Sequence, residues 1–184
     1  METSRATRRQ TYTEKAQAEL GALVERGVQT SGNAFSSVLL AKGAPTQAEL
    51  AEGTPLSGED GTALRAALAA LGYAPEDWCA LLTVDAQGRP LDADLVREAV
   101  ATLDPATVIA CDDEAAEALR EAYADMLVTL DDFEAAMLAP GKEARILGMR
   151  VMALGGFADA LSDPAQKQVM WRRLKQLPPL GEPY

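Results

Sequence analysis

The residues with the clearest potential for chemistry lie in a glycine- and proline-rich segment, residues 41–61, which reads AKGAPTQAELAEGTPLSGEDG. It overlaps the end of an apolar run, residues 37–41, that is typical of a buried strand. Loops of this composition at the end of a strand commonly form binding sites in α/β proteins. Lys42, with the backbone of residues 44–47, has the chemistry to bind an anion or a nucleotide. The segment is not a Walker loop, because the lysine precedes the glycine and no helix is expected to begin directly after it.

Other reactive arrangements are limited by the residue types present. The chain has no histidine, which excludes Ser–His and Cys–His nucleophilic sites and histidine-based metal sites. Its two cysteines, Cys79 and Cys111, lie in apolar segments and are expected in the core; two thiols cannot form a four-cysteine metal site. The acidic run 112–114 could bind a divalent cation, but capping of a helix is the favoured interpretation. We therefore expect no metal and no cofactor.

Composition and charge narrow the classes of partner. The chain has 184 residues, is 48% hydrophobic and carries a formal net charge of −11. Such an acidic chain argues against nucleic-acid binding, because contacts to phosphates need a basic surface. No apolar run approaches the roughly 20 residues of a membrane span, and the N-terminus does not resemble a secretory signal. With two buried thiols as well, we expect a cytoplasmic protein without a membrane segment.

Only a few basic residues could form a local basic patch. They are Lys167, Arg172, Arg173 and Lys175 near the C-terminus, with Arg5, Arg8 and Arg9 near the N-terminus. Trp171, beside two of these arginines, could stack on a nucleic-acid base. Its helical spacing with Leu174 and Leu177 instead favours a place in the core.

Apolar periodicity predicts alternating helices and strands. Four apolar runs, residues 37–41, 78–84, 107–111 and 146–154, predict buried strands. Helices are expected at about 11–29 and 64–72, after Asp92, after Asp112 or Asp113, and at 164–177. This pattern indicates an α/β fold, a three-layer α/β/α arrangement with a central four-stranded, mainly parallel sheet.

The whole chain, residues 1–184, is expected to form one domain with tails at about 1–10 and 178–184. Segment 125–142 fits either a helix or an irregular flap that could cover the site as a lid. Ligands of such sheets bind beyond the carboxyl ends of the strands. The loops at 42–61, 85–91, 112–113 and 155–163 should therefore line any site.

A spaced set of residues in the first of these loops resembles the opening motif of the bacterial and archaeal uracil-DNA glycosylases that carry an iron–sulfur cluster. That motif reads Gly-Glu-Ala-Pro-Gly, then an acidic stretch, then Gly-x-Pro-Phe-x-Gly-x-x-Gly. The matching residues are Ala44, Pro45, Glu49, Gly53, Pro55, Gly58, Gly61 and Leu64. The family's closing motif, with a lysine and a tryptophan on the last helix, resembles residues 156–177, where Asp163-Pro164, Lys167 and Trp171 have similar offsets. The resemblance spans about residues 37–177 and implies a uracil-DNA glycosylase-like fold.

The side chains that this family uses for catalysis have no counterparts here. Gly43 replaces the acidic residue, and Leu56 replaces the aromatic residue that resembles a stacking platform for the base. Leu82 falls where an asparagine reads the uracil edge, and Gly156 falls where a histidine would stabilise the leaving uracil. The cysteines of the iron–sulfur cluster are also absent. Cleavage of the glycosidic bond needs hydrogen-bond donors that stabilise the developing charge, each of which contributes roughly 10²–10³ in rate. Because the family's catalytic and base-reading side chains are missing, the resemblance implies a site without catalytic residues.

The resemblance thus implies a vestigial pocket rather than a working one. Its expected residues are Lys42, Gly43, Ala44, Pro45, Thr46, Gln47, Leu56, Leu82, Gly156, Phe157 and Ala158. If the match is out of register near residues 79–91, Thr83 or Asp85 would replace Leu82 at the position where the family's asparagine reads the uracil edge.

Three functional hypotheses follow from these residues. The favoured one is a pseudoenzyme, a glycosylase-like fold that serves as a binding module for a protein partner. The second is a DNA glycosylase with a rebuilt site for uracil or another damaged base, using Gln47, Glu49 or Asp159 for activation. The third is a small-molecule binder that holds a free base or nucleotide in the vestigial pocket.

Overall fold

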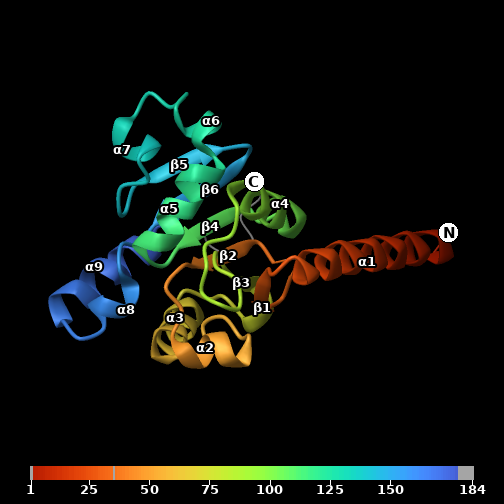
Figure 1. Ribbon diagram of the computed structural model, residues 1–184, viewed down its shortest axis with the longest axis horizontal. Helices are drawn as coiled ribbons and strands as arrows, with labels where there is room; N and C mark the ends of the chain where they lie inside the picture. Colours follow the sequence, from red (N-terminus) through yellow and green to blue (C-terminus); the bar gives the residue numbers. More distant parts are fainter. Residues whose placement is uncertain (1, 35, 178–184) are drawn as a thin grey trace.

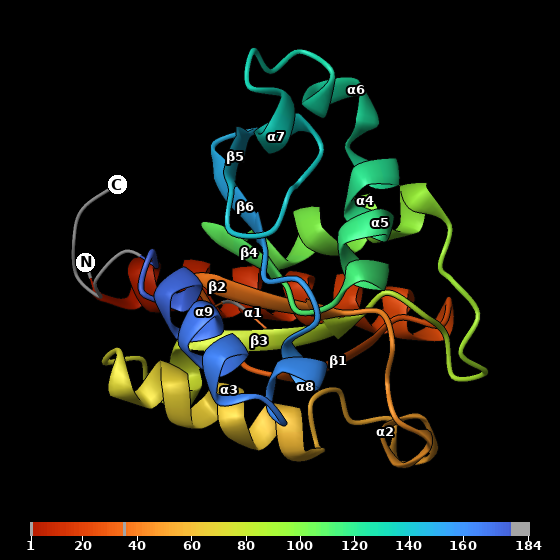
Figure 2. The ribbon, with the colours of Figure 1, turned by 90° about the vertical axis from the view of Figure 1, so that its left-hand side faces the viewer.

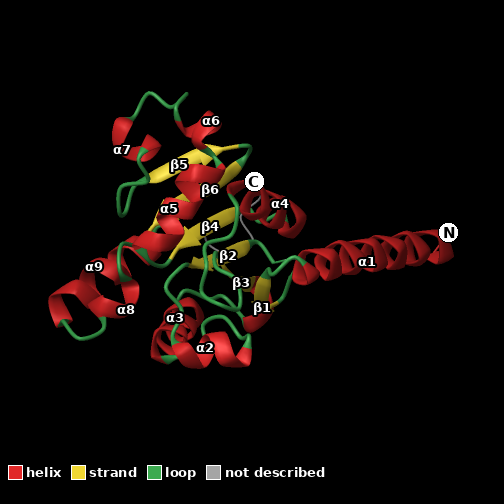
Figure 3. Cartoon of the chain, in the orientation of Figure 1, coloured by secondary structure: helices red, strands yellow, loops and turns green. Residues whose placement is uncertain are grey.

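The computed structural model describes residues 2–34 and 36–177, which form a mixed α/β fold around a six-stranded sheet (Figure 3). The strands are β1 (Gln29–Gly32), β2 (Val38–Lys42), β3 (Trp78–Leu82), β4 (Thr107–Ala110), β5 (Glu143–Ile146) and β6 (Met149–Ala153). Their order is β1-β3-β2-β4-β6-β5. The four central strands run parallel, and the two edge strands pair antiparallel to their neighbours.

The sheet has six strands where the sequence predicted four, because β1 lacks an apolar signal and because the predicted strand 146–154 joins the end of β5 to β6. β1 reads Gln-Thr-Ser-Gly and is only partly buried, so no alternation of apolar and polar residues marks it. The expected strand 146–154 is a hairpin, in which β5 and β6 are joined by a turn at Leu147 and Gly148. Both turn residues have positive φ angles, 49° and 80°, as a tight two-residue hairpin turn requires.

Helices cover both faces of the sheet (Figure 2). One face packs against α1 (Glu2–Glu25), α4 (Ala93–Leu103) and α5 (Asp113–Ala122), and the other against α3 (Glu59–Ala70), α8 (Phe157–Ala160) and α9 (Pro164–Leu174). Along β2, Leu39 belongs to the first core and Leu40 to the second, because successive side chains of a strand point to opposite faces. Two separate apolar cores therefore hold the sheet between two helical layers.

The N-terminal segment is helical from Glu2, where a tail was expected at about 1–10. Helix α1 extends well away from the sheet (Figure 1), and Leu20 and Leu23 near its C-terminal end join the core. Residues 2–10 have no apolar period, so the sequence pattern predicted a helix only from about residue 11. The expected tail at 178–184 lies outside the described residues.

Segment 125–142 contains two single-turn helices, α6 (Ala124–Leu127) and α7 (Phe133–Ala136), in place of one long helix. Both pack against β5, at the edge of the sheet and three strands away from β2. Figure 2 shows them at the top of the molecule, beyond the sheet. The segment therefore does not cover the loop after β2 as a lid.

Candidate functional site

The carboxyl ends of the parallel strands bring the expected loops together. In register, Lys42 of β2 lies beside Leu82 of β3, and Ala110 of β4 lies between Ala41 of β2 and Ala153 of β6. Beyond β6, the backbone N–H of Phe157 donates to the carbonyl of Cys111, at 3.0 Å. The sequence thus predicted correctly that the carboxyl ends of these parallel strands lie side by side.

Lys42 is buried at this edge between two carboxylates. Its Nζ lies 2.7 Å from Oε2 of Glu49 and 2.6 Å from Oδ2 of Asp60, and the three residues are 3%, 0% and 6% exposed. Glu49 comes from α2 (Gln47–Glu52), and Asp60 comes from the first turn of α3. We call these three residues the Lys42 cluster, which joins β2, α2 and α3 through buried charges.

The Lys42 cluster changes what Lys42 can do. Burial alone would lower the pKa of the ammonium, but hydrogen bonds and charge from Asp60 and Glu49 outweigh burial and leave the pKa above its usual value. The side chain of Lys42 therefore stays protonated and does not act as an amine nucleophile. Two carboxylates also surround the cation, so it does not offer its charge to an external anion.

The loop that follows Lys42 begins a helix, contrary to expectation. The side chain of Thr46 accepts a hydrogen bond from the N–H of Glu49, and the N–H of Thr46 donates to the carboxylate of Glu49 at 2.7 Å. This reciprocal arrangement is a capping box, and the spacing Thr-x-x-Glu was its sequence signal. The second oxygen of Glu49, Oε1, is buried and has no hydrogen-bond partner.

Asp112 binds three backbone N–H groups at this edge. Its carboxylate accepts hydrogen bonds from the N–H groups of Gly43 (2.9 Å), Ala44 (2.9 Å) and Ala115 (2.8 Å). Burial raises the pKa of this carboxyl, although the three N–H groups act in the opposite direction. The expected helix cap at Asp112 is confirmed, and the same side chain fills the place where a bound anion would meet the loop.

Position 43 has no room for a side chain. A Cβ atom there would lie 2.6 Å from the backbone nitrogen of Ala115 and 2.6 Å from Cβ of Glu114. The acidic residue that the resemblance implies at this position would therefore collide with the start of α5. Gly156 has more space, but its φ angle of 66° is one that residues other than glycine rarely adopt.

The two leucines at the expected base-binding positions belong to the buried interior. Leu56 and Leu82 are 1% and 0% exposed, and Phe157 is buried as well. Leu56 also has a φ angle of 59°, a strained conformation for a leucine. In the alternative register, Thr83 is buried, and the carboxylate of Asp85 accepts from the N–H of Arg89 in a local turn.

The other candidate residues do not converge on one pocket. Ala44, Thr46, Gln47, Ala158 and Asp159 are exposed, whereas Pro45 and Gly156 are half-buried. Of the three residues considered for a rebuilt site, Glu49 is buried in the Lys42 cluster while Gln47 and Asp159 face solvent.

A cavity of about 150 Å³ lies elsewhere, between α3, α8 and α9, and the sequence did not predict it. Its lining includes Ala67, Phe157, Ala160, Lys167, Met170 and Trp171. Trp171 is only half-buried, and the ammonium of Lys175 lies 5.7 Å from the centre of its ring. In the sequence, the only indication of this cavity is the spacing of Lys167 and Trp171, which are one helical turn apart.

The basic residues near the two termini do not form one patch. Residues 5, 8 and 9 lie in α1, which extends on the opposite side of the molecule from α9 (Figure 1). Any basic surface at α9 is therefore formed by the C-terminal group alone.

Both cysteines are buried, as expected. Burial raises the pKa of the Cys79 thiol to about 11 and that of Cys111 well above its usual value. Within residues 2–34 and 36–177, no group of three or more cysteine, aspartate or glutamate side chains is placed to hold a metal ion.

Comparisons with known proteins add no assignment. No protein-family model matches the chain, and no curated protein matches it significantly. In the part of the chain that the structure describes, no helix combines the length and apolar character needed to cross a membrane.

Proposed function

We propose that this chain is a uracil-DNA glycosylase-like protein without glycosylase activity, and that it serves as a binding module for a protein partner. The observation that carries the proposal is the closure of the loop after β2. Its lysine is bound by the carboxylates of Glu49 and Asp60, and its N–H groups at residues 43, 44 and 46 are bound by those of Asp112 and Glu49.

Two further observations support the absence of catalysis. The lack of space at position 43 excludes an acidic side chain there, and Leu56 and Leu82 are fully buried. A glycosylase needs preorganised donors for the leaving base and polar groups that read its edge. Buried leucines supply neither.

The proposal is tested with single- and double-stranded oligonucleotides that contain one uracil. We expect no base release above the rate without protein, and no change in fluorescence anisotropy at low salt, where electrostatic binding is strongest. An active uracil-DNA glycosylase serves as the positive control for cleavage, and the same oligonucleotides with thymine serve as the control for binding. Uracil-dependent cleavage would overturn the proposal, as would binding of the uracil strand alone or thermal stabilisation by free uracil.

A further inference from the structure

We propose that the cavity between α3, α8 and α9 receives the α6–α7 segment of a second copy of this chain, with Phe133 as the inserted side chain. The inference deepens the proposed function as a binding module, because it names the surface and the partner. It depends on two separate surfaces of the same molecule that match in chemistry.

The receiving surface is an apolar cavity with a basic rim. The cavity of about 150 Å³ is lined mainly by apolar side chains from three helices, with Lys167 and Trp171 among its walls. Residues 164–177 carry four basic side chains and no acidic one, in a chain whose net charge is −11. Lys167 lines the cavity and is exposed, so its charge is available to an approaching partner.

The inserting surface is an acidic segment with exposed apolar side chains. Val128, Phe133 and Met137 are 79%, 76% and 47% exposed, which is unusual for large apolar residues. Residues 128–137 carry three acidic side chains and no basic one. Of the three, Glu134 pairs with Lys142 at 2.6 Å and Asp132 caps α7, and all three side chains are exposed.

Phe133 is held in place before any partner binds. It begins α7, and the carboxylate of Asp132 caps this helix by accepting from the N–H groups of Glu134 and Ala135. The backbone of α7 also packs against β5. Because the segment is already ordered, its insertion loses less conformational entropy than insertion of a flexible loop.

Charge explains why a second copy fits this cavity. Two chains with a net charge of −11 repel each other over most of their surfaces. The cluster of basic residues at α9 is the place where an acidic segment gains attraction instead, and a central apolar side chain surrounded by charged groups is the usual form of a binding hot spot. The aromatic ring of Phe133 would pack against Trp171 and Met170 inside the cavity.

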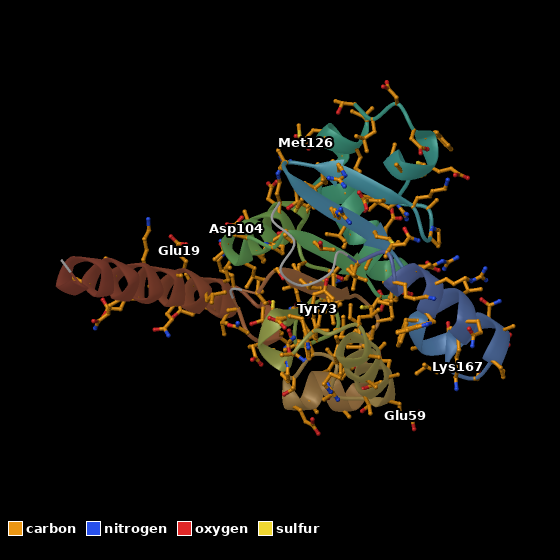
Figure 4. All side chains as sticks on the ribbon, turned by 180° about the vertical axis from the view of Figure 1, so that it is seen from behind. Glu19, Glu59, Tyr73, Asp104, Met126 and Lys167 are labelled. Atoms are coloured by element: carbon orange, nitrogen blue, oxygen red, sulfur yellow. The ribbon has the colours of Figure 1, made fainter. Side chains whose placement is uncertain are left out.

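A contact between the α6–α7 segment of one copy and the cavity of another joins two different surfaces, so each single contact is head-to-tail. Figure 4 labels Met126 in α6 and Lys167 in α9, and the two are well separated in that view. Each copy would use its own α6–α7 segment on one neighbour and its own cavity for another. Such head-to-tail contacts produce closed rings or open chains rather than isolated pairs.

Sedimentation velocity of the full chain tests this inference. We expect association that grows from about 10 µM to about 500 µM protein, because a contact of this small size is weak. Raising the salt from about 50 mM to about 500 mM should weaken the association, because the exposed charges are screened. Phe133→Ser and Lys167→Glu should each raise the dissociation constant about tenfold or more, as expected of hot-spot residues. Both side chains are exposed, so neither change threatens the fold.

A mixing experiment distinguishes head-to-tail contact from other assembly. The Phe133→Ser chain keeps an intact cavity, and the Lys167→Glu chain keeps an intact α6–α7 segment. Their mixture should form pairs and no larger species, although each variant alone is monomeric. Leu147→Asn is the matched control, since Leu147 is also an exposed apolar residue but lies in the β5–β6 turn, and this change should leave the association unaltered.

Three results would overturn the inference. They are a wild-type chain that stays monomeric throughout the concentration range, association that both variants leave unchanged, and a mixture that forms no pairs. None of these results bears on catalysis, which the uracil oligonucleotides test separately. A monomeric chain without glycosylase activity would therefore reject the self-association and leave the proposed loss of activity standing.

Discussion

Replacing Lys42 with methionine is the sharpest test of how the loop after β2 is stabilised. The change removes the shared partner of Glu49 and Asp60 and leaves two carboxylates that are almost fully buried. Removing one partner of a buried ion pair typically costs about 3–5 kcal/mol, because the remaining charge is uncompensated. With two carboxylates affected, we expect a loss near the upper end of that range, out of a total stability of about 5–15 kcal/mol.

The loss is measured by urea unfolding followed by circular dichroism. At a slope of about 2 kcal/mol per M, the midpoint should fall by about 2 M. Lys142→Met is the matched control, because Lys142 forms an ion pair of similar length, 2.6 Å to Glu134, but at the exposed surface. That change should shift the midpoint little, since solvent screens exposed pairs. Equal shifts for the two variants would refute the reasoning.

The pH dependence of the same variant gives an independent check. In the wild type, the raised pKa of Lys42 means that its contribution is fully present below the pKa of an unfolded lysine and is lost as the pH rises through the folded value. In Lys42→Met, neighbouring carboxylates without a cation should have raised pKa values. The difference in stability from wild type should therefore shrink between pH 7 and pH 5. Adding Glu49→Gln and Asp60→Asn to Lys42→Met should recover part of the loss at pH 7.

Three further outcomes follow from individual residues. Gly43→Ala should reduce stability in urea unfolding by about 1–3 kcal/mol, because its Cβ would meet the backbone of Ala115 at 2.6 Å; a wild-type midpoint would contradict the close contact. Leu147→Asn should raise stability by about 1 kcal/mol, because its φ angle of 49° suits asparagine followed by glycine; a lower midpoint would argue against a strained turn. With a thiol pKa of about 11, Cys79 should react with a thiol reagent at pH 8 about 10²-fold more slowly than an unfolded cysteine, and equal rates in native and urea-unfolded protein would contradict its burial.

Apolar runs predicted the central strands, because those strands are buried on both faces. The runs at 37–41, 78–84 and 107–111 correspond closely to β2, β3 and β4. The sequence did not predict the polar edge strand β1. This strand is stabilised by pairing with β3, and local sequence does not show the pairing partner. The strand predicted at 146–154 combines the end of β5, the turn and β6, because Leu147, an apolar residue, occupies the turn.

The sequence indicated the loop after β2 as a candidate site but did not predict its internal bonding. Lys42 was interpreted as a free cation because its partners lie 7 and 18 residues further along the chain, on helices whose packing the sequence does not specify. The cap at Asp112 was predicted from its position before a helix, but its hydrogen bonds to Gly43 and Ala44 depend on the parallel pairing of β2 and β4. Local sequence signals thus indicated Lys42 and Asp112, whereas their hydrogen-bond partners depend on tertiary contacts.

The bonding of this loop also bears on whether substitutions could open it to a ligand. A binding loop must leave donors free for its ligand, and here Glu49, Asp60 and Asp112 bind them within the folded chain. Such a loop is stable without a ligand, because each buried donor already has a partner. A histidine at position 156 would add one group near a site whose other donors stay occupied. Release of all three carboxylates would free the donors, but it would also remove the contacts that hold β2, α2, α3 and α5 together.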